Sequence, residues 1–360
     1  MKTDNVLSKN DSTILKGIAI FFVIGHNFLH LIKPILGENE FYFREKPVNN
    51  FISGLVNDPF NFLIYIFTYM APFIALHLFI FISSYGLTKA YANRDINYFS
   101  FIKKRLIRIY PVFIIALIGL FVYNYIIFRM EFTQSTALDF LLRVTLVANF
   151  IPGKLFVLNG PFWFYSLIVQ LYFCFPILIY FQRKNKYNLI MIAIAAIILI
   201  FSFNQYLSTK DFSLYSVFIG HLPVFIFGIF YALNGNKINK SFKWLVPLSI
   251  MFFVLGLFNV YFWYLSYMTF IIIFLAAFLY LKKYKKPKVI TNFFIFTGGL
   301  SYYIFAVHGF LRKPWIGWAN KSDSDLMYYV YLLIFVIITY IVAIFTRRIE
   351  RFVLAKLKIK

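Results

Sequence analysis

The sequence has few charged residues, and most of them carry the same sign. Of its 360 residues only 14% are charged while 61% are hydrophobic, and 13 acids face 36 bases. Soluble domains carry roughly 25% charged residues, so this composition excludes a water-covered globular protein. The single cysteine, Cys174, excludes a disulfide framework and a thiol metal site, so no metal is expected.

Long apolar runs are what the sequence has instead. Runs of about 17 to 25 residues match the roughly 30 Å that a helix must cross, and their continuity excludes the alternating pattern of a membrane barrel. We predict an all-α, polytopic transmembrane helical bundle of about ten spans, with residues 136–151 as an interfacial or re-entrant piece. The predicted spans are 14–32, 62–87, 110–128, 161–181, 188–204, 213–233, 244–259, 261–281, 292–311 and 327–346.

The distribution of charge predicts the orientation. With the N-terminus inside, the inner segments hold 26 of the 36 bases and four of the 13 acids, so +22 of the net +23 lies on the inner side. Short cytoplasmic loops carry such an excess, which predicts that both termini are cytoplasmic. Anionic lipid of the inner leaflet explains the basic balance without nucleic acid. We therefore expect a multi-pass protein of the inner or plasma membrane, with residues 1–360 as one domain and no signal peptide.

Polar residues within the spans are candidate functional groups. No Asp or Glu falls inside a predicted span, which argues against an ion-coupled transporter built on buried carboxylates. All five histidines do lie in or at the ends of spans: His26, His30, His77, His221 and His308. Histidine titrates near neutral pH, so one of them is the natural candidate for proton transfer in the membrane.

His26 and His30 lie four residues apart, on one face of the first span. One interpretation is a structural pair of histidines that form hydrogen bonds across the bundle. The other is that His26 is a general base that removes a proton from an attacking hydroxyl. We leave His77 and His221 as packing or hydrogen-bonding residues.

Arg105 and Arg108 lie three residues apart at the cytoplasmic surface, in a predicted short helix after which Pro111 starts or kinks the next span. They are either positive-inside charges or a clamp for an anionic cofactor, since guanidiniums match phosphate oxygens. Two further segments contain candidate residues. Ser83 and Ser84 favour close helix packing, and residues 159–166 form an aromatic belt or, through Trp163 and Tyr165, a surface for stacking on a sugar.

Five segments, in order, resemble the integral-membrane acyltransferase 3 family, which includes bacterial polysaccharide O-acetyltransferases. Residues 15–26 are similar to its basic-residue-to-histidine signature, and Lys104-Arg-Leu-Ile-Arg-Ile-Tyr-Pro111 is similar to its Arg-x-x-Arg-Ile-Tyr-Pro motif. The other three segments are residues 77–85, 160–170 and 301–308. The resemblance covers nearly the whole chain, and ten spans are also the architecture of the family.

The resemblance implies an O-acyltransferase that moves an acyl group, acetyl being expected, from cytoplasmic acyl-CoA to a hydroxyl of a cell-surface carbohydrate or its lipid-linked precursor. It implies His26 as the catalytic base, acting on the thioester directly or through a relayed acyl group. Lys16, Arg105 and Arg108 would bind the cofactor, and Trp163, Gln170 and His308 would bind the acceptor. The partners expected are this carbohydrate or glycolipid and membrane lipid.

The sequence departs from the family pattern at several positions. Nine residues separate Lys16 from His26 where the family has ten, which leaves the two about 80° apart on the helix. His77 replaces an acid, Ser84 a glycine and Gln170 a glutamate. Since an amide cannot take a proton, more of the acid–base work falls on His26. The alternative functions are a transporter or flippase for a lipid-linked saccharide, and a glycan polymerase or ligase.

Overall fold

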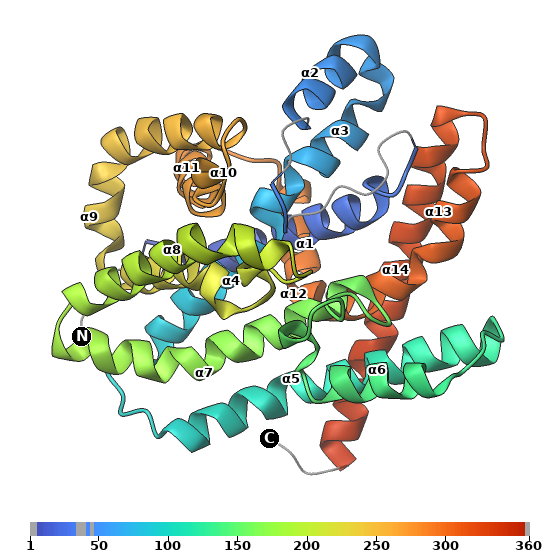
Figure 1. The fold of residues 1–360 in the computed structure, drawn as a ribbon, viewed down its shortest axis with the longest axis horizontal. Helices are drawn as coiled ribbons and strands as arrows, with labels where there is room; N and C mark the ends of the chain where they lie inside the picture. The colour runs from blue at the N-terminus through green and yellow to red at the C-terminus, as the bar shows by residue number, and fades with distance from the viewer. Residues whose placement is uncertain (1–5, 34–40, 44–46, 357–360) are drawn as a thin grey trace.

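The computed structural model of the protein describes residues 6–33, 41–43 and 47–356, and the regular elements of these residues are helices (Figure 1). The predicted inner charges at Lys2, Asp4, Lys358 and Lys360 lie outside the described residues. Short 3₁₀ or π turns flank several helices. The α-helices are α1 (Lys9–Leu29), α2 (Pro47–Asn57), α3 (Phe62–Tyr69), α4 (Ala71–Tyr91), α5 (Tyr98–Phe121), α6 (Gln134–Val144), α7 (Trp163–Lys184), α8 (Tyr187–Ser208), α9 (Phe218–Gly256), α10 (Val260–Trp263), α11 (Ser266–Leu281), α12 (Lys288–Leu311), α13 (Lys313–Ala319) and α14 (Asp325–Lys356).

Among the described residues, eight helical segments are long and apolar enough to cross a membrane, which makes this a multi-pass helical bundle. The ten predicted spans map onto these eight and α11. Two of them, 213–233 and 244–259, both lie in α9, which turns sharply along its length and has non-helical dihedrals at Asn234 (Figure 1). α11 has 16 residues, about 24 Å of helix, and is shorter than the eight candidates.

Two predicted boundaries are wrong. The span expected at 62–87 divides into α3 and α4 at Met70, because Pro72 has no backbone N–H to continue a helix and fits best in the first turn of a new one. The short helix expected before Pro111 is instead the first half of α5, which continues through the proline. Tyr302 of α12 donates a hydrogen bond to the carbonyl of Ile109 (2.6 Å), two residues before the proline, and so joins α12 to this part of α5.

α6 has 11 residues and is too short to cross a bilayer, as expected for the segment at 136–151. Figure 1 shows it beside the end of α5, while α2 and α3 project away from the other helices. α8 and α14 expose long apolar faces that suit contact with lipid, for example at Ile194, Ile198 and Ile337.

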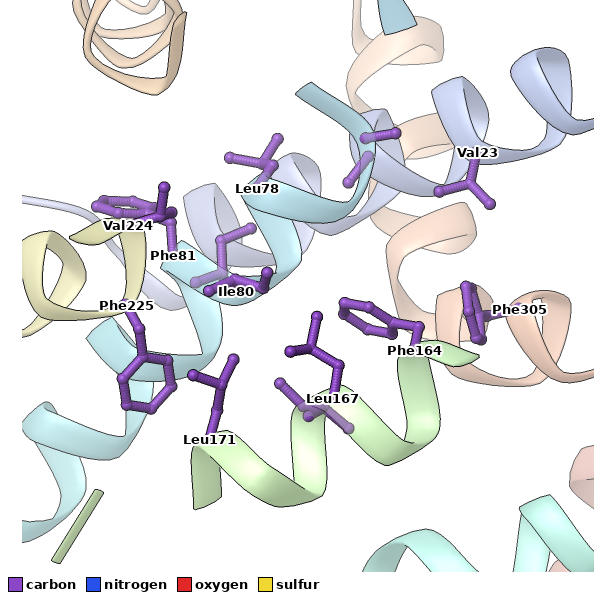
Figure 2. Packing of buried hydrophobic residues seen from close by; sticks show 14 of the residues in the cluster. Val23, Leu78, Ile80, Phe81, Phe164, Leu167, Leu171, Val224, Phe225 and Phe305 are labelled. Carbon is purple, nitrogen blue, oxygen red and sulfur yellow. The ribbon is translucent and has the colours of Figure 1, made fainter. Parts of the chain in front are cut away.

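The core joins α1, α4, α7, α9 and α12. Figure 2 shows side chains of these five helices converging, with Phe164 of α7 facing Phe305 of α12. The ring of Phe81 of α4 lies 5.6 Å from that of Phe227 of α9. The rings of Phe164 and Phe305 are 5.3 Å apart. Dispersion contacts of this kind hold helices together where lipid removes most of the hydrophobic driving force.

Small residues bring two pairs of helices into close contact. A Cβ atom at Gly298 of α12 would lie 1.9 Å from the carbonyl oxygen of Thr13, and one at Gly17 of α1 would lie 2.2 Å from that of Phe294. α1 and α12 therefore pack backbone against backbone. In the same way, Gly228 of α9 leaves room for Ser84 of α4, which supports the packing interpretation of that serine.

Candidate active site

We name the two ends of α1 after the predicted orientation: its N-terminal end is the inner end and its C-terminal end is the outer end. His26 lies near the outer end and is only 6% exposed. Its Nδ1 is 2.9 Å from the carbonyl oxygen of Phe67. A carbonyl can only accept, so Nδ1 carries the proton and Nε2 is the basic nitrogen of the neutral ring. The ring of His30 stacks on that of His26 at 4.5 Å, and its Nδ1 lies 2.5 Å from the His26 carbonyl oxygen. The two histidines are therefore one stacked unit in which the tautomer of each ring is fixed by a carbonyl.

Lys16 lies ten residues before His26 on the same helix, roughly 15 Å away along the axis. It is half-buried, and its charge is close enough to that of Arg108 on α5 for the two to repel. Two cations held near each other without neutralisation favour an anionic ligand. Two of the three predicted cofactor-binding residues therefore lie within electrostatic range of each other, with Lys16 toward the inner end of the helix that carries His26.

Arg105 points elsewhere. Its Nη2 donates to the hydroxyl of Tyr91 (3.1 Å), and its guanidinium lies over the rings of Tyr91 and Phe101 at 5.7 and 5.2 Å. These contacts attach the start of α5 to the end of α4. The two arginines of the predicted clamp therefore differ in their surroundings: Arg108 is exposed, and Arg105 contacts aromatic neighbours.

The aromatic residues at the start of α7 are buried, so they do not form a belt facing the membrane surface. Trp163 is 3% exposed, with its ring 4.8 Å from Phe41 and 6.0 Å from His221. Tyr165 is 2% exposed and packs on Phe113. A sugar could stack on Trp163 only after Phe41 had moved.

The other two predicted acceptor residues have buried polar atoms that no described residue satisfies. Gln170 accepts a hydrogen bond from the first backbone N–H of α9, at Phe218 (3.0 Å), while its Nε2 has no partner there. His308 is fully buried, its Nδ1 is 2.9 Å from the carbonyl oxygen of Phe305, and its Nε2 has no described partner. Because such atoms are costly to bury, they indicate where a polar group of a ligand would be accommodated.

Asn159 is a third residue with a buried polar atom that no described residue satisfies. Its Nδ2 is buried without a described partner, and its side chain lies against Gly309, where a Cβ would be 2.3 Å from Oδ1. Gly309 directly follows His308, so the loop before α7 and the outer end of α12 face each other. Sequence reasoning had placed Asn159 only in an aromatic segment.

The remaining two histidines, His77 and His221, form a second cluster that adjoins Trp163. His77 stacks on Tyr267 of α11 at 3.9 Å and lies 5.1 Å from the ring of His221. His221 Nε2 is 2.8 Å from the carbonyl oxygen of Tyr215. His77 therefore packs on aromatic rings, although neither of its ring nitrogens has a hydrogen-bond partner among the described residues, while His221 makes a hydrogen bond.

Sequence reasoning missed two arginines. Arg312, directly after α12, donates through Nη1 to the carbonyl and side-chain oxygens of Asn27, at 2.6 and 2.7 Å. A possible signal was its position one helical turn after His308. Arg143 is fully buried, and four hydrogen bonds tie it to the loop before α7, at Asn149 and at the carbonyls of residues 154, 155 and 157. Burial lowers the pKa of its guanidinium to about 10, so it remains charged at neutral pH.

Comparison with known proteins gives one match. A family model described as an acyltransferase domain matches residues 10–348, which is nearly the whole chain. No curated protein and no solved structure matches. The matched range includes His26, the cations of the inner end, and the buried polar atoms of α7 and α12.

Proposed function

The chain belongs to the acyltransferase 3 family, and from this premise we propose that it is a membrane O-acyltransferase of the inner or plasma membrane. We propose acyl-CoA, in particular acetyl-CoA, as its donor, and a hydroxyl of a cell-surface carbohydrate or its lipid-linked precursor as its acceptor. The observation that carries the proposal is His26: a buried histidine, held with Nε2 as its basic nitrogen, on a helix with a half-buried cation at its inner end.

The donor would bind at the inner end of the bundle. The phosphates of CoA are anions, and Lys16 and Arg108 are neighbouring cations that no carboxylate of the described residues pairs with within ion-pair distance. Arg105 would add a positive charge at the edge of this donor site. The thioester at the far end of the pantetheine arm would then point along α1 toward His26.

In the proposed reaction, Nε2 of His26 takes the proton of the acceptor hydroxyl as its oxygen attacks the thioester carbonyl. A C–O bond forms, and the C–S bond breaks as the tetrahedral intermediate collapses. The CoA thiolate that leaves takes the proton back from His26, so the enzyme returns to its starting state. A relayed transfer would use the same base for each step.

The acceptor would enter from the outer side. Gln170, His308 and Asn159 supply buried polar atoms with unused hydrogen-bonding capacity, the chemistry that sugar hydroxyls match. Trp163 would line this region rather than stack directly on the sugar, because its ring is buried between neighbours that include Phe41 and His221.

The test is acyl transfer in membranes that contain the full chain, followed with acetyl-CoA labelled in the acetyl group. We expect wild-type membranes to move label into a glycan or lipid fraction and His26→Ala membranes to do so about 10²- to 10⁴-fold more slowly, the usual contribution of a general base. Ser249→Ala, which changes a buried polar residue of α9 outside the site, is the control. Wild-type rates in His26→Ala would refute the mechanism, and saccharide movement without acetyl-CoA consumption would favour the transporter.

A further inference from the structure

The outer end of α1 has an unusual set of hydrogen-bond partners. The last four carbonyls of a helix have no partner within it. In α1, the carbonyls of His26, Phe28 and Leu29 accept from the backbone N–H groups of His30, Leu31 and Ile32, at 3.1 to 3.2 Å. The carbonyl of Asn27 instead accepts from Arg312, which comes from another part of the chain.

Arg312 is well suited to this position. One of its N–H groups bridges the carbonyl oxygen (2.6 Å) and the side-chain oxygen (2.7 Å) of Asn27, the residue directly after His26. Its positive charge lies at the negative end of the α1 dipole, where cations are stabilising. Hydrogen bonds to a charged donor are also about twice as strong as neutral ones.

Asn320 holds the next turn of the chain. Its Nδ2 donates to the carbonyl of Leu31 (2.8 Å), and its Oδ1 accepts from the backbone N–H of Lys33 (2.9 Å). Arg312 and Asn320 lie directly before and after α13. The two ends of this short segment therefore form hydrogen bonds to residues 27–33, at the end of α1. We call this segment, residues 312–320, the outer bracket.

We propose that Arg312 is a positioning residue of the acyltransferase, and that with Asn320 it fixes the end of α1 so that the imidazole of His26 stays aimed at the reacting groups. The inference rests on the proposed role of His26 as the base. The last turn of a helix frays when its carbonyls lose their partners, and His26 is the residue next to the one that Arg312 holds. Displacement of a catalytic group by about 1 Å can cost 10²-fold in rate.

The experiment measures the maximal rate and the KM for acetyl-CoA in membranes that contain the full chain and the acceptors of the host. The variants are Arg312→Gln, Arg312→Lys and Asn320→Ala, with Lys313→Gln as control because it removes a neighbouring, exposed cation. We expect Arg312→Gln to lower the maximal rate about 10- to 100-fold with an unchanged KM, because the donor site lies at the other end of α1. Arg312→Lys should recover part of the loss, since an ammonium can still donate to Asn27, and Lys313→Gln should match wild type.

Several results would overturn the inference: a wild-type maximal rate in Arg312→Gln, a change in KM alone, no recovery in Arg312→Lys, or an equal loss in Lys313→Gln. If Arg312→Gln does not accumulate in membranes, Asn320→Ala decides, with an expected loss of roughly threefold or more in maximal rate and an unchanged rate as refutation. The failure of the proposed function is a different result, namely wild-type membranes without acyl transfer or a fully active His26→Ala.

Discussion

The two ends of α1 are held by different means. At the inner end, Gly17 and Gly298 let the backbones of α1 and α12 touch, and the charges of Lys16 and Arg108 lie within electrostatic range of each other. At the outer end, the rings of His26 and His30 are stacked, and the helix terminus is held by charged and amide donors from the outer bracket. The inner end also has polar contacts, in the capping box of Ser8 and Asp11 and in the ion pair of Asp11 with Lys282. The outer end differs because its hydrogen bonds come from residues 312–320 and hold the helix terminus next to His26.

This difference matches the tasks proposed for the two ends. A site for a soluble, multiply charged donor needs cations that are open to the aqueous side, and it tolerates some freedom of the side chains. A general base needs a fixed ring and a defined tautomer, which only directional contacts provide. Changes at the inner end should therefore alter stability or KM, whereas changes at the outer end should alter the maximal rate.

The largest effect at the inner end should come from Gly298→Ala. Its Cβ would lie 1.9 Å from the carbonyl oxygen of Thr13, so α1 and α12 would have to separate. We expect a loss of about 1 to 3 kcal/mol in stability, measured by thermal unfolding in detergent. Gly299→Ala is the matched control, because a Cβ there meets nothing within 4 Å. Equal stability of the two variants would show that close backbone packing does not hold this end.

A smaller effect is expected from Arg108→Gln. Removing one of two neighbouring cations should raise the KM for acetyl-CoA roughly three- to tenfold, about 1 kcal/mol of binding, and leave the maximal rate unchanged. The effect should shrink as salt is added, because exposed charges are screened. Lys104→Gln, an exposed cation of the same helix, controls for overall surface charge. A lower maximal rate with an unchanged KM would contradict the proposal that the inner end binds the donor and the outer end sets the rate.

The smallest effect should come from Lys282→Gln, which removes an ion pair with Asp11 at the inner end. The two charged atoms are 2.5 Å apart, but the lysine is 43% exposed, so we expect a loss of about 0 to 1 kcal/mol in the free energy of unfolding. Asp11→Ala should cost about 1 kcal/mol more, because Asp11 also accepts from the backbone and side chain of Ser8 in the capping box of α1. Chemical denaturation of the two variants would rank these contacts, and an equal loss in both would contradict this ranking.

The sequence by itself predicted the membrane class, the helical bundle, the family and a buried histidine on α1. These properties depend on short stretches of sequence. Apolar runs of a given length must cross a bilayer as helices, and the order of the family motifs can be read directly along the chain. The same local reasoning failed at Met70 and in α5, where one proline begins a helix and another is carried inside one. Proline restricts the backbone in both cases, and its neighbours in space decide the outcome.

Only the tertiary structure decided which polar groups meet. Arg312 and Asn27 are 285 residues apart in sequence, and neither segment has a sequence pattern that predicts their contact. The same holds for Gln170 with the first residue of α9, and for Lys16 with Arg108 across two helices. A hydrogen bond depends on distances of a few tenths of an ångström between atoms that the fold brings together. Hydropathy and charge place a residue at a depth in the membrane, while the packing of helices determines what it touches.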